Sequence, residues 1–197
     1  LLEVPYEYAD SHGRLIYIAK SYYDALDNNN GGTTLTIGSG VLVTGPASGT
    51  IGNTNVTNQG TLELVAGSTI TLAGTNWSNQ GTILVNGGSQ ALVFNSGLFN
   101  SGVVSGYSGA LVVNGGFTNQ GTLNFLNSVG TFNAAVVNAK AWISDPSTLT
   151  FAGNYTVTTN GYVSAGDGDR YVFQGNVVNQ STNNVLWNTL NVSPTDR

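Results

Sequence analysis

One stretch of sequence, Val56-Thr57-Asn58-Gln59-Gly60-Thr61-Leu62, recurs along the chain in nearly the same form. Full copies begin at Trp77 and Phe117, and degenerate copies lie between them and toward the C-terminus. The Asn at the third position returns every 19 to 22 residues, as Asn58, Asn79, Asn100, Asn119, Asn138, Asn160 and Asn179. Self-similarity at such a period is the signature of units that stack on one another. The sequence therefore predicts a solenoid.

The kind of solenoid follows from the apolar runs between the Asn positions. Short runs such as Ile70-Thr71-Leu72 and Leu111-Val112-Val113 are separated by Gly, Asn, Ser and Thr, which is typical of strands joined by turns. Helical periodicity and the Leu-x-x-Leu-x-Leu pattern of leucine-rich repeats are both missing. We therefore predict an all-β, right-handed parallel β-helix with about 20 residues per coil, its hand following the general crossover preference.

The recurring Asn residues have a structural interpretation. Stacked coils would place each Asn over the next one, where side-chain amides can hydrogen-bond in a ladder. We expect all seven to form a structural column. Trp77 takes the position of Val56 and Phe117 in the repeat, so we expect it in the core. Trp142 and Trp187 are left open between the core and an exposed position, where an indole could stack on a sugar.

The N-terminal part of the chain differs from the rest. Residues 1–27 carry seven charged side chains, whereas Glu63 is the only one between Asn28 and Ala139. Five of the nine tyrosines also lie in this segment. We therefore divide the chain into an N-terminal arm or cap, residues 1–30, and a β-helix, residues 31–197. Periodicity does not choose between helix and strand for residues 14–26.

Both ends of a solenoid expose strand edges, which need a cap or will pair with other chains. The arm could cover the first coil of its own chain, or it could dock on a neighbouring molecule by strand addition. The residues proposed for such docking are Leu15, Ile16, Tyr17, Ile18, Tyr22 and Tyr23. No amphipathic segment follows the last Asn copy, so a head-to-tail homopolymer is expected, although truncation of a longer protein would look the same.

Charged residues in the repeat region are too few and too scattered for a predicted active site. Polysaccharide lyases and hydrolases need a clustered acid and base. The residues available are Glu63, Lys140, Asp145, Asp167, Asp169 and Arg170. Glu63 is several coils from the others, and no acidic position recurs from coil to coil. We therefore predict no catalytic residue, no cofactor and no enzymatic activity.

Two acids could bind calcium, but the signal is weak. Asp167 and Asp169 alternate with glycine, as in calcium-binding turns, yet a third acid is missing. A turn with solvated charges is the alternative. With His12 as the only histidine and no cysteine, neither a His- or Cys-based metal site nor a catalytic triad can form.

Composition narrows the partners further. The net charge of −5 and the five Lys and Arg residues disfavour nucleic acid. No apolar run is long enough to insert into a membrane. The chain has no Met and begins at Leu1 without a leader, from which we expect a processed form or fragment of an exported protein.

Thr-x-Thr steps raise the alternative of ice binding, since a flat face of threonines can order water. They occur at Thr34, Thr69, Thr148 and Thr156, each followed by a second Thr two residues later. They do not recur in every coil, and outward Thr is ordinary in strands.

The Asn-Gln-Gly-Thr coils at Asn58, Asn79 and Asn119, with Gly-Ser-Thr-Ile-Thr-Leu steps between them, resemble the repeats of large bacterial surface proteins. These include filamentous-haemagglutinin-like adhesins and autotransporter passengers, and the likeness covers roughly residues 33–190. The stretch from Asp169 to Thr189 also resembles a recurrent closing motif of such exported proteins. The resemblance implies export and a surface or matrix role, and carries over no catalytic residue.

We therefore expect a structural subunit of an extracellular bacterial assembly, a filament or matrix fibre in which β-helices associate end to end with copies of themselves. The main alternative is a monomeric surface adhesin or glycan-binding module. An ice-binding protein and a polysaccharide lyase or hydrolase are further alternatives.

Overall fold

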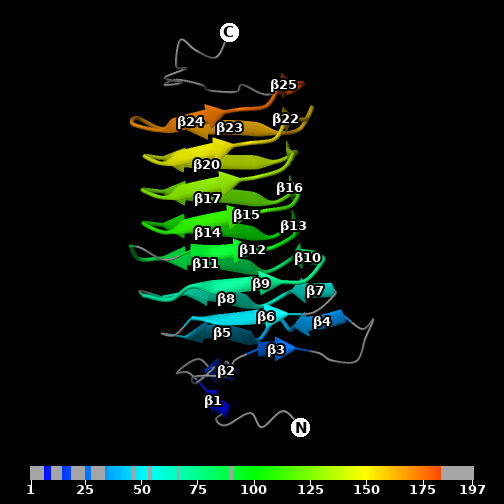
Figure 1. Cartoon of the computed structure of the whole chain (residues 1–197), viewed down its shortest axis with the longest axis vertical. Helices are drawn as coiled ribbons and strands as arrows, with labels where there is room; N and C mark the ends of the chain where they lie inside the picture. Colours follow the sequence, from blue (N-terminus) through cyan, green and yellow to red (C-terminus); the bar gives the residue numbers. More distant parts are fainter. Residues whose placement is uncertain are drawn as a thin grey trace.

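The chain forms a parallel β-solenoid of about seven turns, with about 21 residues per turn (Figure 1). The computed structural model describes residues 34–45, 48–52, 55–65, 67–88 and 91–182, together with the strands at 7–9, 15–18 and 25–27. These residues contain no helix, so none of them builds a helix that could cross a membrane. The predicted fold class is confirmed; the right-handed winding stays a prediction.

Each coil contributes one strand to each of three parallel sheets, which we name A, B and C. Sheet A contains β1 (Glu7–Ala9), β2 (Leu15–Ile18), β5 (Val41–Gly45), β8 (Thr61–Leu64), β11 (Thr82–Asn86), β14 (Val103–Tyr107), β17 (Thr122–Leu126), β20 (Ala141–Asp145) and β23 (Tyr162–Ala165). Sheet B contains β3 (Ala25–Asp27), β6 (Gly49–Gly52), β9 (Ile70–Ala73), β12 (Ala91–Phe94), β15 (Ala110–Val113), β18 (Val129–Phe132), β21 (Thr148–Phe151) and β24 (Arg170–Phe173). Sheet C contains β4 (Thr34–Ile37), β7 (Asn55–Asn58), β10 (Asn76–Asn79), β13 (Gly97–Asn100), β16 (Phe117–Asn119), β19 (Val136–Asn138), β22 (Tyr155–Val157) and β25 (Val177–Asn179).

The strands of neighbouring coils pair in register, so that equivalent residues stand over one another. Asn58 pairs with Asn79, 21 residues on, and Asn119 pairs with Asn138, 19 residues on. Because side chains alternate between the two faces of a strand, each column lies either inside or outside the solenoid.

The first described strands join the same sheets. β2 pairs in parallel with β5, and β3 pairs in parallel with β6. β1 runs antiparallel to β2 and is the first strand of sheet A. Within residues 14–26, for which the sequence left helix or strand open, the described parts, β2 and the start of β3, are strands. The predicted boundary at residue 30 falls between β3 and β4, which belong to different sheets.

The interior is filled by apolar side chains from all three sheets. In β11, Ile83 and Val85 are buried while their neighbours are half-buried, and other strands alternate in the same way. Aromatic rings stack along the C-terminal half of the core: Phe132 and Phe151 lie 5.2 Å apart at 8°. Trp77 is in the core as predicted, and Trp142 is fully buried. Trp187, Tyr22, Tyr23 and His12 lie outside the described residues.

Candidate functional site

The Asn column is a buried hydrogen-bond ladder that runs along the solenoid axis. Asn58, Asn79, Asn100 and Asn119 each donate from Nδ2 to the Oδ1 atom of the Asn one coil further on, ending at Asn138, at 2.7 to 2.9 Å. All five side chains are buried.

A second bond from each amide reaches the backbone. Asn100 Nδ2 also donates to the carbonyl of Thr122, which begins β17, the sheet A strand of the next coil, and Asn119 does the same to Ala141, which begins β20. Each amide therefore ties its own coil to the next one and fixes the turn between sheets C and A. A buried amide is stable only when it is paired in this way.

The ladder is shorter than the predicted column. Ile37 pairs with Asn58 at one end, and Val157 pairs with Asn138 at the other. The prediction for Asn160 is wrong: Asn160 lies exposed in the turn after β22, and Val157 takes its position. Asn179 does follow Val157 in register, but it is exposed, and its Oδ1 accepts a hydrogen bond from the Ser181 amide instead.

Glycine stacking fixes the same turn, and the sequence analysis missed it. A Cβ atom on Gly81 would overlap the carbonyl oxygen of Gly60, one on Gly102 that of Gly81, and one on Gly121 that of Gly102. The backbones of successive coils pass too close for any side chain at this point. Close packing of the coils therefore requires the Gly of the repeated Asn-Gln-Gly-Thr motif. The recurrence of this Gly in the sequence could have predicted the requirement.

A second hydrogen-bond column runs along the turn between sheets A and B. The Ser128 amide donates to Ser147 Oγ at 3.1 Å, and the Ser147 amide donates to Asp169 Oδ1 at 2.5 Å. Asp169 Oδ2 accepts from the Gly166 amide and from Ser144 Oγ, at 2.9 and 2.6 Å. Asp169 is only 2% exposed, so this carboxylate is a buried acceptor for neighbouring donors.

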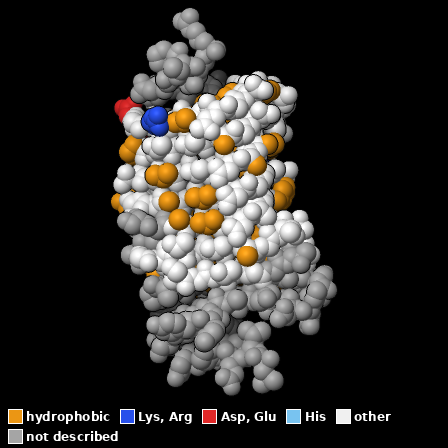
Figure 2. Space-filling model, viewed as in Figure 1, with side chains coloured by type: hydrophobic (Ala, Val, Ile, Leu, Met, Phe, Trp, Pro, Cys, Tyr) orange, Lys and Arg blue, Asp and Glu red, His pale blue; other side chains and the backbone are white. Residues whose placement is uncertain are grey.

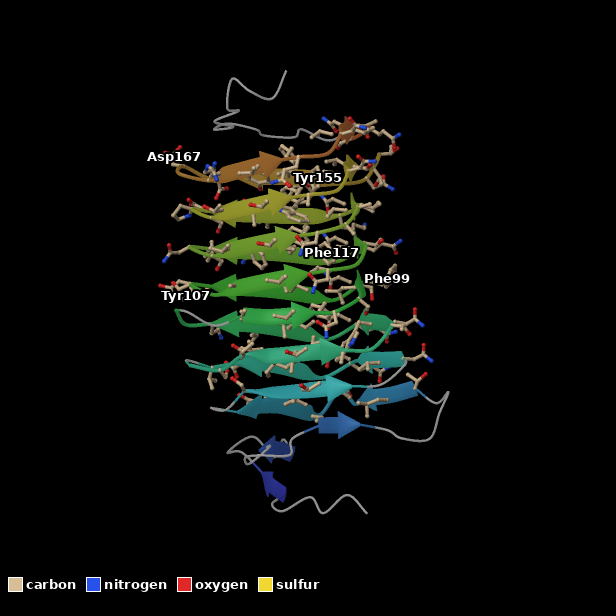
Figure 3. All side chains as sticks on the ribbon, viewed as in Figure 1. Phe99, Tyr107, Phe117, Tyr155 and Asp167 are labelled. Atoms are coloured by element: carbon tan, nitrogen blue, oxygen red, sulfur yellow. The ribbon has the colours of Figure 1, made fainter. Side chains whose placement is uncertain are left out.

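The positions of Asp167 and Asp169 do not support the calcium site considered from the sequence. Asp167 is exposed, as Figure 3 shows, whereas both oxygens of Asp169 face inward and accept protein hydrogen bonds. The two carboxylates therefore do not face a common site. Within the described residues, no three His, Cys, Asp or Glu side chains come together as metal ligands would.

The remaining charged residues are spread over the solenoid surface. Glu63 lies on β8 and accepts a hydrogen bond from Asn86 at 3.2 Å. Lys140, Asp145 and Arg170 are exposed and lie near the C-terminal end of the described solenoid. Gly166 packs directly against Asp145, so this carboxylate lies beside the turn that holds Asp167. The only buried acid of the group is Asp169.

The Thr-x-Thr steps lie on two different sheets. Those at Thr34 and Thr156 are in sheet C, whereas those at Thr69 and Thr148 are in sheet B. Between the two steps of sheet B, Val93 and Val112 take the outward position that Thr71 holds in β9. The structure therefore does not unite the threonines in one array.

Two tyrosines near the C-terminal end of the core have raised pKa values. Burial raises the pKa of Tyr155 well above its usual value of 10.0, and the neighbouring Tyr171 raises it further. Burial also raises the pKa of Tyr171, and Asp169 adds to this, while a hydrogen bond with Ser144 opposes it. Both hydroxyls therefore stay protonated in the folded protein at physiological pH. Both side chains are buried in the core, where Figure 3 shows Tyr155.

The ends of sheet C present complementary backbone groups. At the C-terminal end, the Asn176 carbonyl and the Gln180 amide bond to β22. Since alternate residues of a parallel strand bond to the same neighbour, Val177 and Asn179 turn their amides and carbonyls to the open side. At the N-terminal end, the Ile37 carbonyl accepts from the amides of Gln59 and Gly60, just after β7, so the groups of Thr36 face the open side. Among the described residues, no strand covers either edge.

The predicted docking residues of the arm lie in a different environment. Leu15, Ile16, Tyr17 and Ile18 form β2, which is paired with β1 on one edge and β5 on the other. Leu15, Ile16 and Tyr17 are thus paired on both edges, and strand addition through them would require β1 to leave β2. Docking through the arm stays a prediction. The outer strands at this end are β1, β3 and β4.

Comparison with known proteins found no similar chain: no family model matches the sequence, and neither a curated protein nor a solved structure matches it. What the chain does must therefore be argued from its own geometry.

Proposed function

We propose that this protein is a structural subunit of an extracellular bacterial assembly in which β-solenoids associate end to end. The observation that carries the proposal is the complementarity of the two edges of sheet C. Continuing the register of the sheet would place Thr36 of one molecule over Val178 of the next, because both lie in the same outward column. The Thr36 amide would then donate to the Val177 carbonyl, and the Asn179 amide to the Thr36 carbonyl.

Sheet B supports the same direction of association, whereas sheet A does not continue in parallel. Sheet B begins with β3 and ends with β24, and sheet C begins with β4 and ends with β25, all running in parallel. A second molecule placed on the C-terminal end would therefore meet parallel strands in both sheets. In sheet A it would meet β1, which runs antiparallel. Identical heterologous contacts of this kind build open filaments.

The surface between the ends also suits a fibre. The face seen in Figure 2 is mostly uncharged, with scattered apolar groups. The basic group (blue) and the acidic group (red) visible on it both lie near the C-terminal end. Tyr107 is 62% exposed and Val129 is 49% exposed. Low charge weakens repulsion between parallel rods, and exposed apolar groups favour contact between them.

The extracellular and bacterial parts of the proposal rest on the sequence resemblance to bacterial surface proteins. The absence of cysteine is consistent with stability drawn from backbone pairing, the Asn ladder and the core. The proposal assigns no catalytic residue, no cofactor and no partner other than further copies of the chain.

The experiment blocks each end separately. Thr36→Pro removes the amide hydrogen that faces the N-terminal side, and Asn179→Pro removes the one that faces the C-terminal side. Thr36→Ala and Asn179→Ala are the matched controls, because they lose the same side chains but keep the amide hydrogens. All variants are checked for unchanged circular dichroism, then examined by light scattering and negative-stain electron microscopy.

We expect fibres from the wild type and both alanine variants, and monomers from each proline variant alone. Mixing the two proline variants should give dimers and nothing longer, because only one intact end of each is available. Wild-type protein that stays monomeric, proline variants that form fibres, or a mixture without dimers would each contradict end-to-end assembly. Deleting residues 1–27 is a poorer test, since it also removes β2 and β3.

A further inference from the structure

Sheet C has a hollow on its outer face. It has a volume of about 460 Å³ and runs along the strands β7, β10, β13 and β16, with Thr34 of the end strand β4 at its N-terminal margin. This volume lies within the range of roughly 300–1,000 Å³ that small-molecule sites usually have. Its lining includes Thr57, Asn76, Ser78, Phe99 and Thr118. None of the residues that line it is charged.

The hollow arises from a local change in the repeat. Asn55 and Asn76 stand one over the other in β7 and β10, but Gly97 takes the next position in that column, with Gly116 beyond it. A Cβ on Gly97 would come within 2.7 Å of the Gly116 carbonyl oxygen. Gly97 and Gly116 therefore have no side chain at the position where the two preceding coils have the side chains of Asn55 and Asn76. The exposed backbone of these two glycines forms the floor of the hollow.

Phe99 forms a wall of the hollow. It follows Thr57 and Ser78 in the outward column of sheet C and precedes Thr118, so an aromatic ring stands where the other three coils have small hydroxyl side chains. Phe99 is 40% exposed, and Figure 3 shows it on the side of the solenoid opposite Tyr107. An exposed phenyl ring beside a glycine floor offers a flat apolar surface for stacking.

Polar groups surround this ring. Asn76 Nδ2 donates to Asn55 Oδ1 at 2.8 Å, which holds the two amides in a fixed orientation. A carboxamide has two N–H groups and a carbonyl, so this contact uses one of the Asn76 donors. The hydroxyls of Thr57, Ser78 and Thr118 add groups that both donate and accept. The hollow thus combines an aromatic face with several neutral hydrogen-bonding groups.

This chemistry selects one class of ligand. A phosphate or nucleic acid would require Lys or Arg, and none lines the hollow. A peptide strand would require an open edge, but β10 and β13 are paired on both sides. Sugar rings have apolar C–H faces that stack on aromatic rings and hydroxyls that pair with amides and other hydroxyls. We propose that the hollow binds a neutral polysaccharide, with one sugar ring stacked on Phe99.

The test is native affinity electrophoresis of freshly prepared, unassembled chains through gels that contain a soluble neutral polysaccharide, each compared with a gel that contains none. Four are used separately: a mixed-linkage β-glucan, an α-glucan, a galactomannan and an arabinoxylan. We expect at least one to retard the wild-type chain. Phe99→Ala should weaken that binding about tenfold, Phe99→Trp should keep it, and Asn76→Ala should weaken it. Tyr107→Ala, which removes an exposed aromatic ring elsewhere, is the matched control and should migrate like the wild type.

Two results would overturn this proposal: no retardation of the wild type by any of the four polysaccharides, or equal retardation of Phe99→Ala and the wild type. The proposal is independent of end-to-end assembly, because Asn76 and Phe99 lie on β10 and β13, away from the end strands β4 and β25. The monomeric Asn179→Pro variant should therefore bind the same polysaccharide as the wild type, so that loss of assembly and loss of binding can be told apart.

Discussion

Asn100 donates a hydrogen bond from Nδ2 to Oδ1 of Asn119 across 2.8 Å, and both side chains are fully buried. Asn100 also accepts from Asn79 at 2.7 Å, so it holds the middle of the ladder. The ladder joins five coils through groups that water cannot reach. Its contribution to stability is therefore the most direct consequence of the repeat.

Asn100→Ala should lower the free energy of unfolding by about 2–3 kcal/mol, because it leaves buried amide groups on two neighbouring coils without their partners. Asn58→Ala should cost less, since Asn58 lies at the end of the ladder and makes only one amide bond to another Asn. Urea unfolding followed by circular dichroism measures both. Equal losses for the two variants would mean that the ladder bonds do not act as described.

Gly81→Ala should destabilise the solenoid by about 1–3 kcal/mol, because the new methyl group would overlap the Gly60 backbone and push the two coils apart. Gly40 is the control, since a Cβ there meets nothing within 4 Å. Gly40→Ala should change the free energy of unfolding by less than about 0.5 kcal/mol. Thermal unfolding of the two variants tests this, and an unaffected Gly81→Ala would contradict the stacking argument.

Asp169→Asn should lower the free energy of unfolding by about 2–3 kcal/mol, because an amide nitrogen would face donors that now meet carboxylate oxygens. Asp167→Asn should have no measurable effect, since that side chain is exposed. The same melting curves, repeated with millimolar calcium and then with a chelator, should superimpose for the wild type. A rise in melting temperature with calcium that Asp167→Asn abolishes would restore a calcium site.

Stability should fall at alkaline pH. The pKa of Tyr155 is raised on folding, so the folded state holds this proton more tightly than the unfolded state, whose tyrosine titrates near 10.0. Its contribution is complete below about pH 10 and is lost as the pH rises toward the higher pKa of the folded state.

Tyr155→Phe should therefore reduce the loss of stability above about pH 10, and Tyr107→Phe, at an exposed position, should leave it unchanged. Urea unfolding between neutral pH and pH 11 gives the comparison. If the wild type and Tyr155→Phe lose stability equally, another group causes the alkaline transition.

The fold could be predicted because the residues that hold successive coils together recur in the sequence once per coil. A buried ladder of side-chain amides needs an amide in every coil that it joins, so Asn58, Asn79, Asn100 and Asn119 appear in the sequence at the spacing of the coils. Asn160 was misplaced for a physical reason. Its Asn-Gly pair resembles the repeat, but strand pairing aligns Val157 with Asn138, and Asn160 follows in the turn.

The turn between sheets A and B could not be predicted in the same way. Ser128, Ser147 and Asp169 share a column only after the lengths of the preceding turns are known, and their side chains differ. A buried acid among serines gives no periodic signal. The outer hollow could not be predicted for the same reason. Gly97 and Phe99 form part of a site only because the strand register places them beside Asn76 and Ser78, and the sequence alone does not give that register.

End-to-end assembly is the central claim, and the mass of a fibre per unit length tests it most directly. Each chain contributes eight strands to sheet C, and at roughly 4.8 Å each these give a repeat of roughly 38 Å along the filament. Scanning transmission electron microscopy should therefore find one 20.4 kDa chain for about every 38 Å of a single filament, or a small integer multiple for laterally paired filaments. One chain for about every 4.8 Å would indicate refolded cross-β fibrils and would contradict the assembly of intact solenoids.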